Sequence, residues 1–558
     1  MPLTSPPLRR GLLALVAAAA VLVWVGTVAN TALDPDESQH LHAAWLVGQG
    51  QAPFAEFWEH HSPLLYYLLA PLTRGLADSP AVYFGGRALM ALTAAAALCL
   101  VYRLAVRLSP GAALAAVTLL AFLPRFVQHA TEVRPDVPAL VAWLGALLAL
   151  VRWRESGGAG RLWAAGLALG VAVAFTPKAA YGAPGIAAVV VLVEWGRGPG
   201  ALGRALAGWA RLAAGAALPV LALLGVLWLH GGGRALDGFT EHVLARALDF
   251  ADFTKEGPVS EEGAGFLVLA LAGLVLIARR LGRSTLEHPL HGTLLPPLAA
   301  TVAVLLLPTT PAVYRHAWLP VLAGLAVYAG CALATAFPRS PGLAALAVLV
   351  GLVGPATISI RNAIVDGNSV QLAVMRRQLA RACPGEPVLD GTALYVFRPA
   401  AYRYHVLMRG IRKWIAEGVI PEERIVEDVR QARPRVAYVD SRLRALVGPM
   451  ADFLAQHYVP LPDGLLAAGA AIGPAPPRDG GRAEVELLLS ETYRLSASPG
   501  APEVDIAIDQ RPVRPGLVRL EAGRHEVTWR GSVGLIRLTT LDCAERRALG
   551  TAPRALSR

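Results

Sequence analysis

The chain has 558 residues, of which 55% are hydrophobic and only 16% charged, and its mean hydropathy is +0.48. Soluble globular proteins carry about 25% charged residues, so this composition excludes an ordinary soluble domain. The net charge of +11 does not indicate nucleic-acid binding, because much of the excess is arginine in short loops between apolar segments.

The apolar residues are gathered into long runs. The run from Gly11 to Thr31 has no charged residue, and a membrane span needs about 20 such residues. A signal peptide with Arg9 and Arg10 as its basic flank is the alternative, but more runs of this kind follow. We predict about eleven spans, near residues 11–32, 81–102, 111–130, 137–151, 162–176, 182–196, 208–230, 264–278, 290–308, 317–336 and 341–360.

The loops between these spans alternate in charge. One set is rich in arginine, including Arg103, Arg152 and Arg279, and the other is rich in acids, including Asp36 and Asp136. The positive-inside rule places the arginine-rich set in the cytoplasm. With an odd number of spans, the N-terminus is cytoplasmic and everything after about Arg361 lies outside. We therefore predict a multi-pass protein of the inner (plasma) membrane.

The part after residue 361 has a different pattern. Short buried strands and helical spacing predict an extracytoplasmic α/β domain over residues 362–468. A stretch rich in Pro, Gly and Ala at 469–481 reads as a linker, and alternating strands predict a small antiparallel β-domain over 482–545. In this polar region Cys383 and Cys543 either pair as a disulfide or remain two free thiols.

The first acidic motif, Leu33 to His40, follows the first span. Three carboxylates, Asp34, Asp36 and Glu37, lie at a predicted membrane surface, where one of them is a candidate general base. The alternative is structural: Asp34 suits a helix N-cap, Pro35 the first helical position, and the two other acids the first turn. Local physics leaves both readings open.

The second motif, Glu132 to Pro138, lies at the outer ends of two predicted spans. Ionisable groups at membrane depth are costly and tend to be functional, which makes Arg134 and Asp136 candidates. The alternative is an interfacial ion pair between Arg134 and Asp136, with Asp136 also capping the next helix.

The third motif, Glu59 to Leu64, leads into a predicted interfacial helix that carries Tyr66 and Tyr67. His60 and His61 beside an acid could bind a metal or a phosphate, although their spacing matches no strong metal signature. The alternative reading makes Ser62 the N-cap and leaves the histidines solvated, which we favour for His60 while His61 stays open.

Two cationic positions complete the set. Arg315, with His316 beside it, opens the tenth predicted span, and Lys178 follows the fifth. A guanidinium fits a phosphate with two parallel hydrogen bonds, and an ammonium meets it as a point charge. The alternatives are an interfacial arginine beside aromatic residues and a lysine that reaches toward the headgroups.

Together, these motifs resemble the GT-C superfamily of membrane glycosyltransferases, and within it the bacterial dolichyl-phosphate-mannose-protein mannosyltransferase-like and aminoarabinose-transferase-like branch. The resemblance is carried, in order along residues 10–360, by Pro35-Asp36-Glu37, His61-Ser62-Pro63-Leu64-Leu65-Tyr66-Tyr67, Arg134-Pro135-Asp136 and Tyr314-Arg315-His316-Ala317-Trp318-Leu319-Pro320. One departure is that His61-Ser62-Pro63 stands where the family's interfacial helix often begins Lys-Pro-Pro.

The resemblance implies a polytopic helical membrane protein with a GT-C-like catalytic domain over residues 1–361. It implies transfer of a sugar from a polyprenyl-phosphate carrier to a glycan, lipid or protein acceptor on the outer face, with Asp36 as base, Glu37 as second choice and Asp136 orienting the acceptor or sharing the role. The carrier phosphate would be held by Arg315 first, then by Lys178, Arg134, His61 and His316. The sequence assigns no cofactor and leaves a divalent metal open.

Two other classes of function compete with this reading. A transporter or flippase for lipid-linked sugars would place its charged residues along a path at mid-membrane, whereas the charges here lie near one predicted face. A membrane protein that only binds glycan through its outer β-domain would make Asp36 and Asp136 dispensable.

Overall fold

The computed structural model describes residues 6–245, 256–257, 263–281, 287–310, 313–336, 354–473, 480–497, 505–531 and 534–552. By its internal contacts the chain divides into two units. The helical unit comprises residues 1–33, 46–73 and 81–368, and the C-terminal unit comprises residues 34–45, 74–80 and 369–558. Each unit is described by itself.

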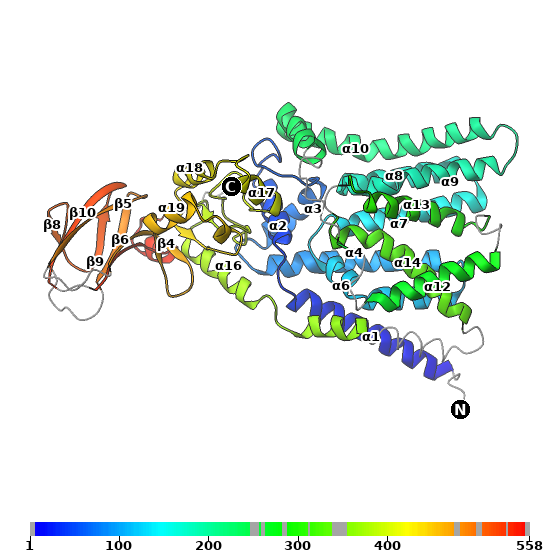
Figure 1. The fold of residues 1–558 in the computed structure, drawn as a ribbon, viewed down its shortest axis with the longest axis horizontal. Coiled ribbons are helices and arrows are strands. Elements are labelled where there is room, and N and C mark those ends of the chain that lie inside the picture. Colours follow the sequence, from blue (N-terminus) through cyan, green and yellow to red (C-terminus); the bar gives the residue numbers. More distant parts are fainter. Residues whose placement is uncertain are drawn as a thin grey trace. The chain divides into compact units, whose positions relative to one another are not determined.

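Apolar helices build the helical unit (Figure 1). Their bounds are α1 Pro6–Asn30, α3 Leu64–Gly75, α4 Ala81–Ala105, α5 Pro110–Phe122, α6 Pro124–Thr131, α7 Asp136–Ser156, α8 Ala159–Phe175, α9 Ala183–Trp195, α10 Ala201–Phe239, α12 Ala264–Leu281, α13 His291–Leu306 and α14 Leu319–Ala336. Three short helices join them: η1 Pro177–Gly182, the π-helical η2 Thr240–Ala245 and η5 Arg315–Trp318.

Within the described residues, six helical segments are long and apolar enough to cross a membrane, and a seventh results if α5 and α6 form one broken span. Three further apolar helices, α8, α13 and the first part of α12, are shorter. Each of the first ten predicted spans overlaps one of these helices, but the count of about eleven is not confirmed. The eleventh, 341–360, lies largely outside the described residues, of which only 354–360 continue as helix.

The third predicted span is bent rather than straight. The axes of α5 and α6 meet at 68°. Leu123, between them, is extended (φ −71°, ψ 115°), and Pro124 follows at the first position of α6. A proline disfavours helical geometry in the residue before it, and its ring suits the first turn of a new helix. The sequence Leu123-Pro124 therefore ends one helix and starts the next.

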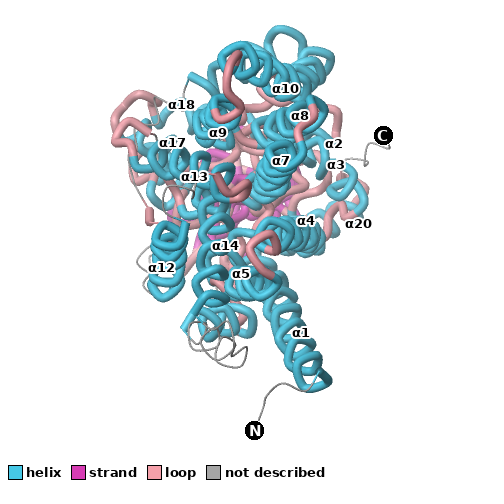
Figure 2. The backbone as a smooth tube through the Cα atoms, turned by 90° about the vertical axis from the view of Figure 1, so that its right-hand side faces the viewer, coloured by secondary structure: helices cyan, strands magenta, loops and turns pink. Residues whose placement is uncertain are grey.

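Small residues let α8 lie against α10, and Figures 1 and 2 both show α8 between α10 and α7. A Cβ at Gly166 would come within 2.3 Å of the Leu212 carbonyl oxygen, and one at Gly170 within 2.2 Å of the Ala216 carbonyl oxygen. Glycines four residues apart allow two backbones to approach closely where the hydrophobic effect does not drive helices together.

A buried arginine joins α4 to the end of α1. Arg87 is 1% exposed, and its guanidinium donates to the Val28 carbonyl oxygen in the last turn of α1 at 3.3 Å and to those of Thr31 and Ala32, just after the helix, at 2.9 and 2.8 Å. The carbonyls at a helix C-terminus lack partners within the helix and carry partial negative charge. Arg87 therefore satisfies the end of α1 and is itself compensated inside the helical unit.

Among the described residues after 368, two sheets and five α-helices form most of the C-terminal unit. The helices are α16 Ser369–Arg381, α17 Arg409–Ala416, α18 Glu422–Ala432, α19 Pro449–His457 and α20 Cys543–Ala548. The strands are β1 Val388–Leu389, β2 Val436–Ala437, β3 Tyr458–Pro460, β4 Leu466–Ile472, β5 Gly481–Leu487, β6 Glu491–Ala497, β7 Asp505–Ile508, β8 Arg511–Val513, β9 Gly516–Leu520, β10 Gly523–Arg530 and β11 Ile536–Thr540.

One sheet contains strands from both predicted domains, 362–468 and 482–545, so the predicted linker at 469–481 does not separate two domains. Its order is β1-β2-β4-β11-β6-β9, with β3 paired to β4. A four-stranded sheet, β5-β10-β7-β8, packs against its second half around a core that includes Leu495, Val527 and Leu538. Inward-facing residues alternate along these strands, as expected for two sheets packed face to face.

The start of the predicted linker is in fact strand β4. Its sequence, Leu466 to Ile472, is mostly alanine and glycine, residues that rarely indicate a strand. The packing explains the choice of residue: a Cβ at Gly469 would lie 1.9 Å from the Leu538 carbonyl oxygen on the neighbouring strand β11. Only glycine fits this close approach.

A disulfide closes the C-terminal unit. Cys383 and Cys543 are paired, with their Cα atoms 5.1 Å apart and a sequence separation of 160. Beside it, the Arg546 guanidinium donates to both carboxylate oxygens of Glu386, and Arg435 donates to the same carboxylate at 2.9 Å. Of the two options left open by the sequence, the structure has the disulfide.

Two buried aspartates follow the parallel strands β1 and β2. Asp390 is 0% and Asp440 9% exposed. Asp390 accepts hydrogen bonds from the Thr392 and Ala393 backbone and from the Gln378 amide, while Asp440 accepts from the Gly391 backbone at 2.7 Å. Burial and the negative charge of Asp440 raise the pKa of Asp390 to about 7.

The topology inferred from the arginine pattern is tested by cysteine labelling. Ser156, at the exposed end of α7, is predicted to be cytoplasmic, and Val447, 83% exposed, extracytoplasmic. In a background with Cys99 and Cys331 replaced by alanine, an impermeant thiol reagent added to intact cells should label Val447→Cys and not Ser156→Cys. Labelling of both from the same side would contradict the scheme.

The raised pKa of Asp390 predicts a pH-dependent stability. Between about pH 4, where the unfolded carboxyl titrates, and about pH 7, the folded chain holds one more proton, so stability falls as pH rises, by at most roughly 1.4 kcal/mol per pH unit. Asp390→Asn should flatten the melting temperature of the full chain between pH 5 and 7, because the Gln378 amide can turn to accept from the new amide. The exposed Asp452→Asn is the control, and an unchanged slope in Asp390→Asn would refute the assignment.

Candidate active site

Asp36 and Glu37 lie in the first turn of α2, Pro35–Gly48. The Asp34 carboxylate accepts from the Asp36 backbone N–H at 2.8 Å, and the Glu37 carboxylate accepts from the Asp34 backbone N–H at 3.0 Å. Asp34 thus caps the N–H of the second helical residue, and Glu37 at the third position reaches back to the cap residue, as in one half of a capping box. Asp34 and Glu37 therefore have the structural, helix-capping role that was the alternative for the first motif. Glu37 is fully buried, and Asp36 is half-buried. Both acids belong to the C-terminal unit, whereas the other predicted site residues belong to the helical unit.

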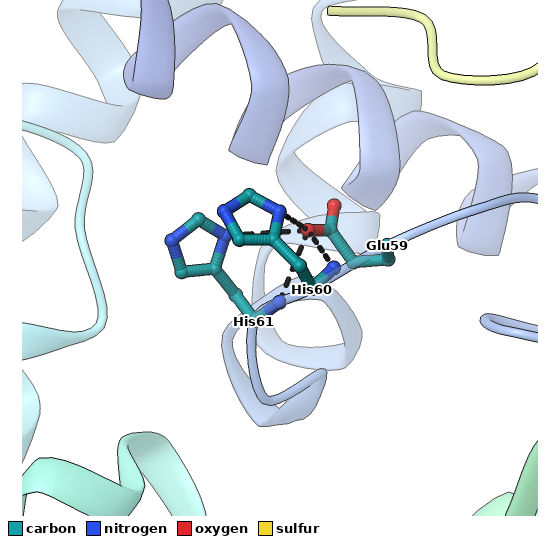
Figure 3. A group of neighbouring side chains, drawn as sticks. All are labelled: Glu59, His60 and His61. Atoms are coloured by element: carbon teal, nitrogen blue, oxygen red, sulfur yellow. Dashed lines mark hydrogen bonds and ion pairs between the residues drawn. The ribbon is translucent and has the colours of Figure 1, made fainter. Parts of the chain in front are cut away.

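Glu59, His60 and His61 form a cluster in front of α3 (Figure 3). Glu59 is fully buried, and its Oε1 atom lies 3.2 Å from the Nδ1 atom of each histidine. The backbone N–H groups of His60 and His61 donate to the same oxygen at 2.7 and 3.1 Å. Burial alone would raise the pKa of Glu59, but the hydrogen bonds and positive charges of the two histidines lower it well below its ordinary value.

Ser62 has a different role from the predicted N-cap. Its hydroxyl donates to the Ala174 carbonyl oxygen near the end of α8. Helix α3 begins at Leu64, and the Pro63 carbonyl accepts the first backbone hydrogen bond, from Tyr66. The Ser62 hydrogen bond connects the segment that precedes α3 to the end of α8, just before the chain enters η1.

Glu132 is the centre of a buried ionic cluster between α6 and α7. Its Oε2 atom lies 2.8 Å from His129 Nδ1 and 2.9 Å from Arg134 Nε. Burial alone would raise the pKa of Glu132, but the positive charges of His129 and Arg134 outweigh it and lower the pKa to about 2. Arg134, a predicted phosphate ligand, thus donates to Glu132.

A cavity in the helical unit brings three of the predicted site residues together. Asp136 at the start of α7, Lys178 in η1 and His316 in η5 line it, and the space not filled by atoms is about 460 Å³, a volume that includes open solvent at its mouth. Lys178 Nζ lies 3.5 Å from His316 Nε2. The ring of His316 packs edge-on against that of His129, with ring centroids 6.3 Å apart. This contact connects the cavity to the Glu132 cluster.

The remainder of the cavity wall is mainly apolar and aromatic. It includes Leu140, Trp143 and Pro320, with Tyr181 and Thr301 as further polar groups. A pocket with apolar walls and a few convergent polar groups is the usual form of a small-molecule site. An ammonium, an imidazole and a carboxylate beside apolar walls fit an amphiphile that carries an anionic group.

Arg315, the first choice for the carrier phosphate, lies elsewhere. Its side chain is 47% exposed, and its Nε atom lies 3.2 Å from the Glu256 carboxylate. It is not among the residues that line the cavity, whereas its neighbour His316 is. The role of Arg315 remains a prediction, as does that of Asp36.

Sequence reasoning missed His129, Tyr181 and Thr301. The spacing of His129 and Glu132, three residues apart on a helical turn, was the available signal for the ionic cluster. Thr301 lies inside an apolar run, and Tyr181 resembles an interfacial aromatic residue. Neither pattern distinguishes a cavity wall from ordinary packing.

Comparison with known proteins gives one family and one fold. The family model described as dolichyl-phosphate-mannose-protein mannosyltransferase matches residues 60–222. This range contains His61, Arg134, Asp136 and Lys178. Among curated protein sequences, no relative matches the chain.

Two solved structures are similar to the chain. ArnT from Cupriavidus metallidurans, bound to undecaprenyl phosphate, is 14% identical over 82% of this chain and 98% of its own, with a TM-score of 0.53. The archaeal oligosaccharyltransferase AglB from Archaeoglobus fulgidus, in complex with an inhibitory peptide and a dolichol-phosphate, is 13% identical over 82% of this chain and 74% of its own, with a TM-score of 0.48.

At this level of identity the likeness to ArnT bears on the fold alone, and it agrees with the family model and with the motifs. The resemblance found in the sequence is confirmed: this chain has the fold of the GT-C membrane glycosyltransferases and matches the mannosyltransferase family model over residues 60–222.

Proposed function

We propose that the chain transfers a sugar from a polyprenyl-phosphate carrier to an acceptor at the outer face of the membrane. The observation that carries the proposal is the cavity in which Asp136, Lys178 and His316 meet beside apolar walls. The fold is shared with ArnT, whose structure holds undecaprenyl phosphate, and this likeness supports a carrier of the same chemical class here.

The three polar groups suit the two ends of the reaction. An acceptor hydroxyl or amine attacks the anomeric carbon, and the bond between that carbon and the phosphate oxygen breaks. Asp136 takes the acceptor proton as general base. The carrier phosphate leaves with the bonding electrons, and Lys178 with His316 stabilises its charge. The apolar wall at Leu140, Trp143 and Pro320 receives the first part of the lipid chain.

The buried cluster of Glu132, His129 and Arg134 helps to position His316 in this arrangement. The carboxylate holds His129 at 2.8 Å, and the His129 ring packs on His316. Glu132 is a positioning residue in this scheme, because it acts on the cavity through His129 and not by touching a reacting atom. The cluster also keeps charge inside an apolar unit compensated.

The direct test is transfer by the purified full-length protein. It is reconstituted in liposomes and incubated with a panel of radiolabelled polyprenyl-phosphate sugars and an envelope extract. Label should pass from the lipid phase to one acceptor fraction for at least one donor. If every donor is instead moved across the bilayer with its sugar still attached, the chain is a flippase, and the proposal fails.

The carboxylates are tested by isosteric amides. Loss of a general base costs roughly 100- to 10,000-fold in rate, whereas loss of a helix cap costs about 1 kcal/mol of stability and little activity. Asp136→Asn should abolish transfer while leaving the melting temperature nearly unchanged. Asp36→Asn, tested in parallel, distinguishes the sequence prediction for Asp36 from a capping role, and Glu37→Gln follows in the same way. Near-normal turnover of Asp136→Asn would remove it from the site.

The phosphate contact is tested by comparing two cations. Lys178 lines the cavity, and Arg315 pairs with Glu256 outside it. Lys178→Ala should weaken donor binding by roughly tenfold or more, since a charge-assisted hydrogen bond contributes about 1.5–3 kcal/mol. Arg315→Ala should change donor affinity much less. The opposite order, with Arg315→Lys only partly rescuing, would return the phosphate to Arg315.

A further inference from the structure

We propose that Glu59, His60 and His61 form a binding site for one divalent transition-metal ion of the zinc class. The three side chains offer two imidazole nitrogens and a carboxylate oxygen, all within 4.8 Å of one another (Figure 3). The inference concerns a site outside the cavity wall and does not depend on the proposed transfer reaction.

The distances fit a shared ion. Zinc binds histidine nitrogen at about 2.0–2.1 Å and carboxylate oxygen at about 2.0–2.2 Å, so two ligand atoms of a tetrahedral ion lie about 3.4 Å apart. Each Nδ1 atom of His60 and His61 lies 3.2 Å from Glu59 Oε1. Both rings therefore already stand near the separation that a common ion requires.

The carboxylate is oriented before any ion binds. The backbone N–H groups of His60 and His61 hold Glu59 Oε1 at 2.7 and 3.1 Å. The indole of Trp58 stacks on the His60 ring, with centroids 5.3 Å apart and planes inclined by 20°. Contacts of this kind around the ligands fix their direction and increase metal affinity.

Burial and access favour a cation at this place. Glu59 has no exposed side-chain surface, and a buried carboxylate needs a compensating positive charge. The His60 and His61 side chains are 19% and 24% exposed. An ion can thus reach the imidazole side of the cluster from solvent and meet the carboxylate on its buried side.

The ligand set selects the kind of metal. Magnesium and calcium prefer oxygen ligands, whereas two imidazoles with one carboxylate suit zinc and its neighbours. Three protein ligands leave a tetrahedral ion one open position for water or an oxyanion. The Ser62 hydrogen bond to Ala174 links this segment to the chain that leads to Lys178, so the ion would stiffen the approach to the cavity.

The competing account is that the histidines compensate Glu59 by hydrogen bonds and their own charge, with no metal. Equilibrium dialysis decides between the two. Full-length protein without a polyhistidine tag is stripped with EDTA, dialysed against Zn²⁺, and its metal content is measured by mass spectrometry. Wild type should bind one tight Zn²⁺ per chain, and Co²⁺ in its place should give the visible absorption of a low-symmetry site.

Substitutions locate the ion. His60→Ala and His61→Ala should each lower Zn²⁺ affinity by roughly tenfold or more, while His230→Ala, which removes an imidazole that contacts Tyr67 and Gly50, should not. Zn²⁺ should also raise the melting temperature of wild type but not of the two variants. The proposal fails if wild type takes up no tight Zn²⁺, a result that does not depend on whether the variants fold. It also fails if the folded variants retain wild-type Zn²⁺ affinity.

Discussion

The polar groups inside the helical unit depend on the hydrogen bonds of the buried Glu132 carboxylate. A carboxylate among apolar helices is stable only if it is paired and hydrogen-bonded. Glu132 meets this condition through His129 at the end of α6 and Arg134 ahead of α7. Since the His129 ring packs on His316, the same pair also fixes the start of η5. The junction of α6 and α7 and the distant segment η5 are thereby brought together at one cavity.

Close packing of small residues determines what lies around this cavity. Gly166 and Gly170 bring α8 against the backbone of α10, and α8 leads directly into η1 with Lys178. At the end of η1, a Cβ at Gly182 would lie 2.0 Å from the Trp143 ring. Close contacts at glycines that tolerate no larger residue therefore help to place Lys178 and Trp143, which is how an apolar bundle without a hydrophobic driving force obtains a defined site.

How much of this the sequence could predict differs between the two units. Length and polarity indicated ten apolar segments that are helices in the structure, and ionisable residues at their ends indicated Asp136, Lys178 and His316. Neighbouring residues in a helical turn point about 100° apart, so a motif cannot tell whether Arg315 or His316 faces inward. The alanines and Gly469 of strand β4 are typical of a linker in the sequence. They are present because β4 packs closely on β11, a contact that the sequence alone does not reveal.

The charges in the cavity constrain how an anion can be bound. Asp136 and Lys178 cancel each other, and Arg134 is engaged by Glu132. A phosphate entering beside Lys178 therefore adds net negative charge in apolar surroundings, unless His316 carries a proton. His316 lies 3.5 Å from the Lys178 ammonium, and it also interacts electrostatically with the buried Glu132 carboxylate. The phosphate itself would favour the imidazolium once bound, and departure of the sugar, which leaves a more highly charged phosphate, would favour it further. In the proposed reaction, a histidine at this position would supply positive charge where negative charge develops, and the buried Glu132 carboxylate would stabilise the imidazolium in an apolar interior.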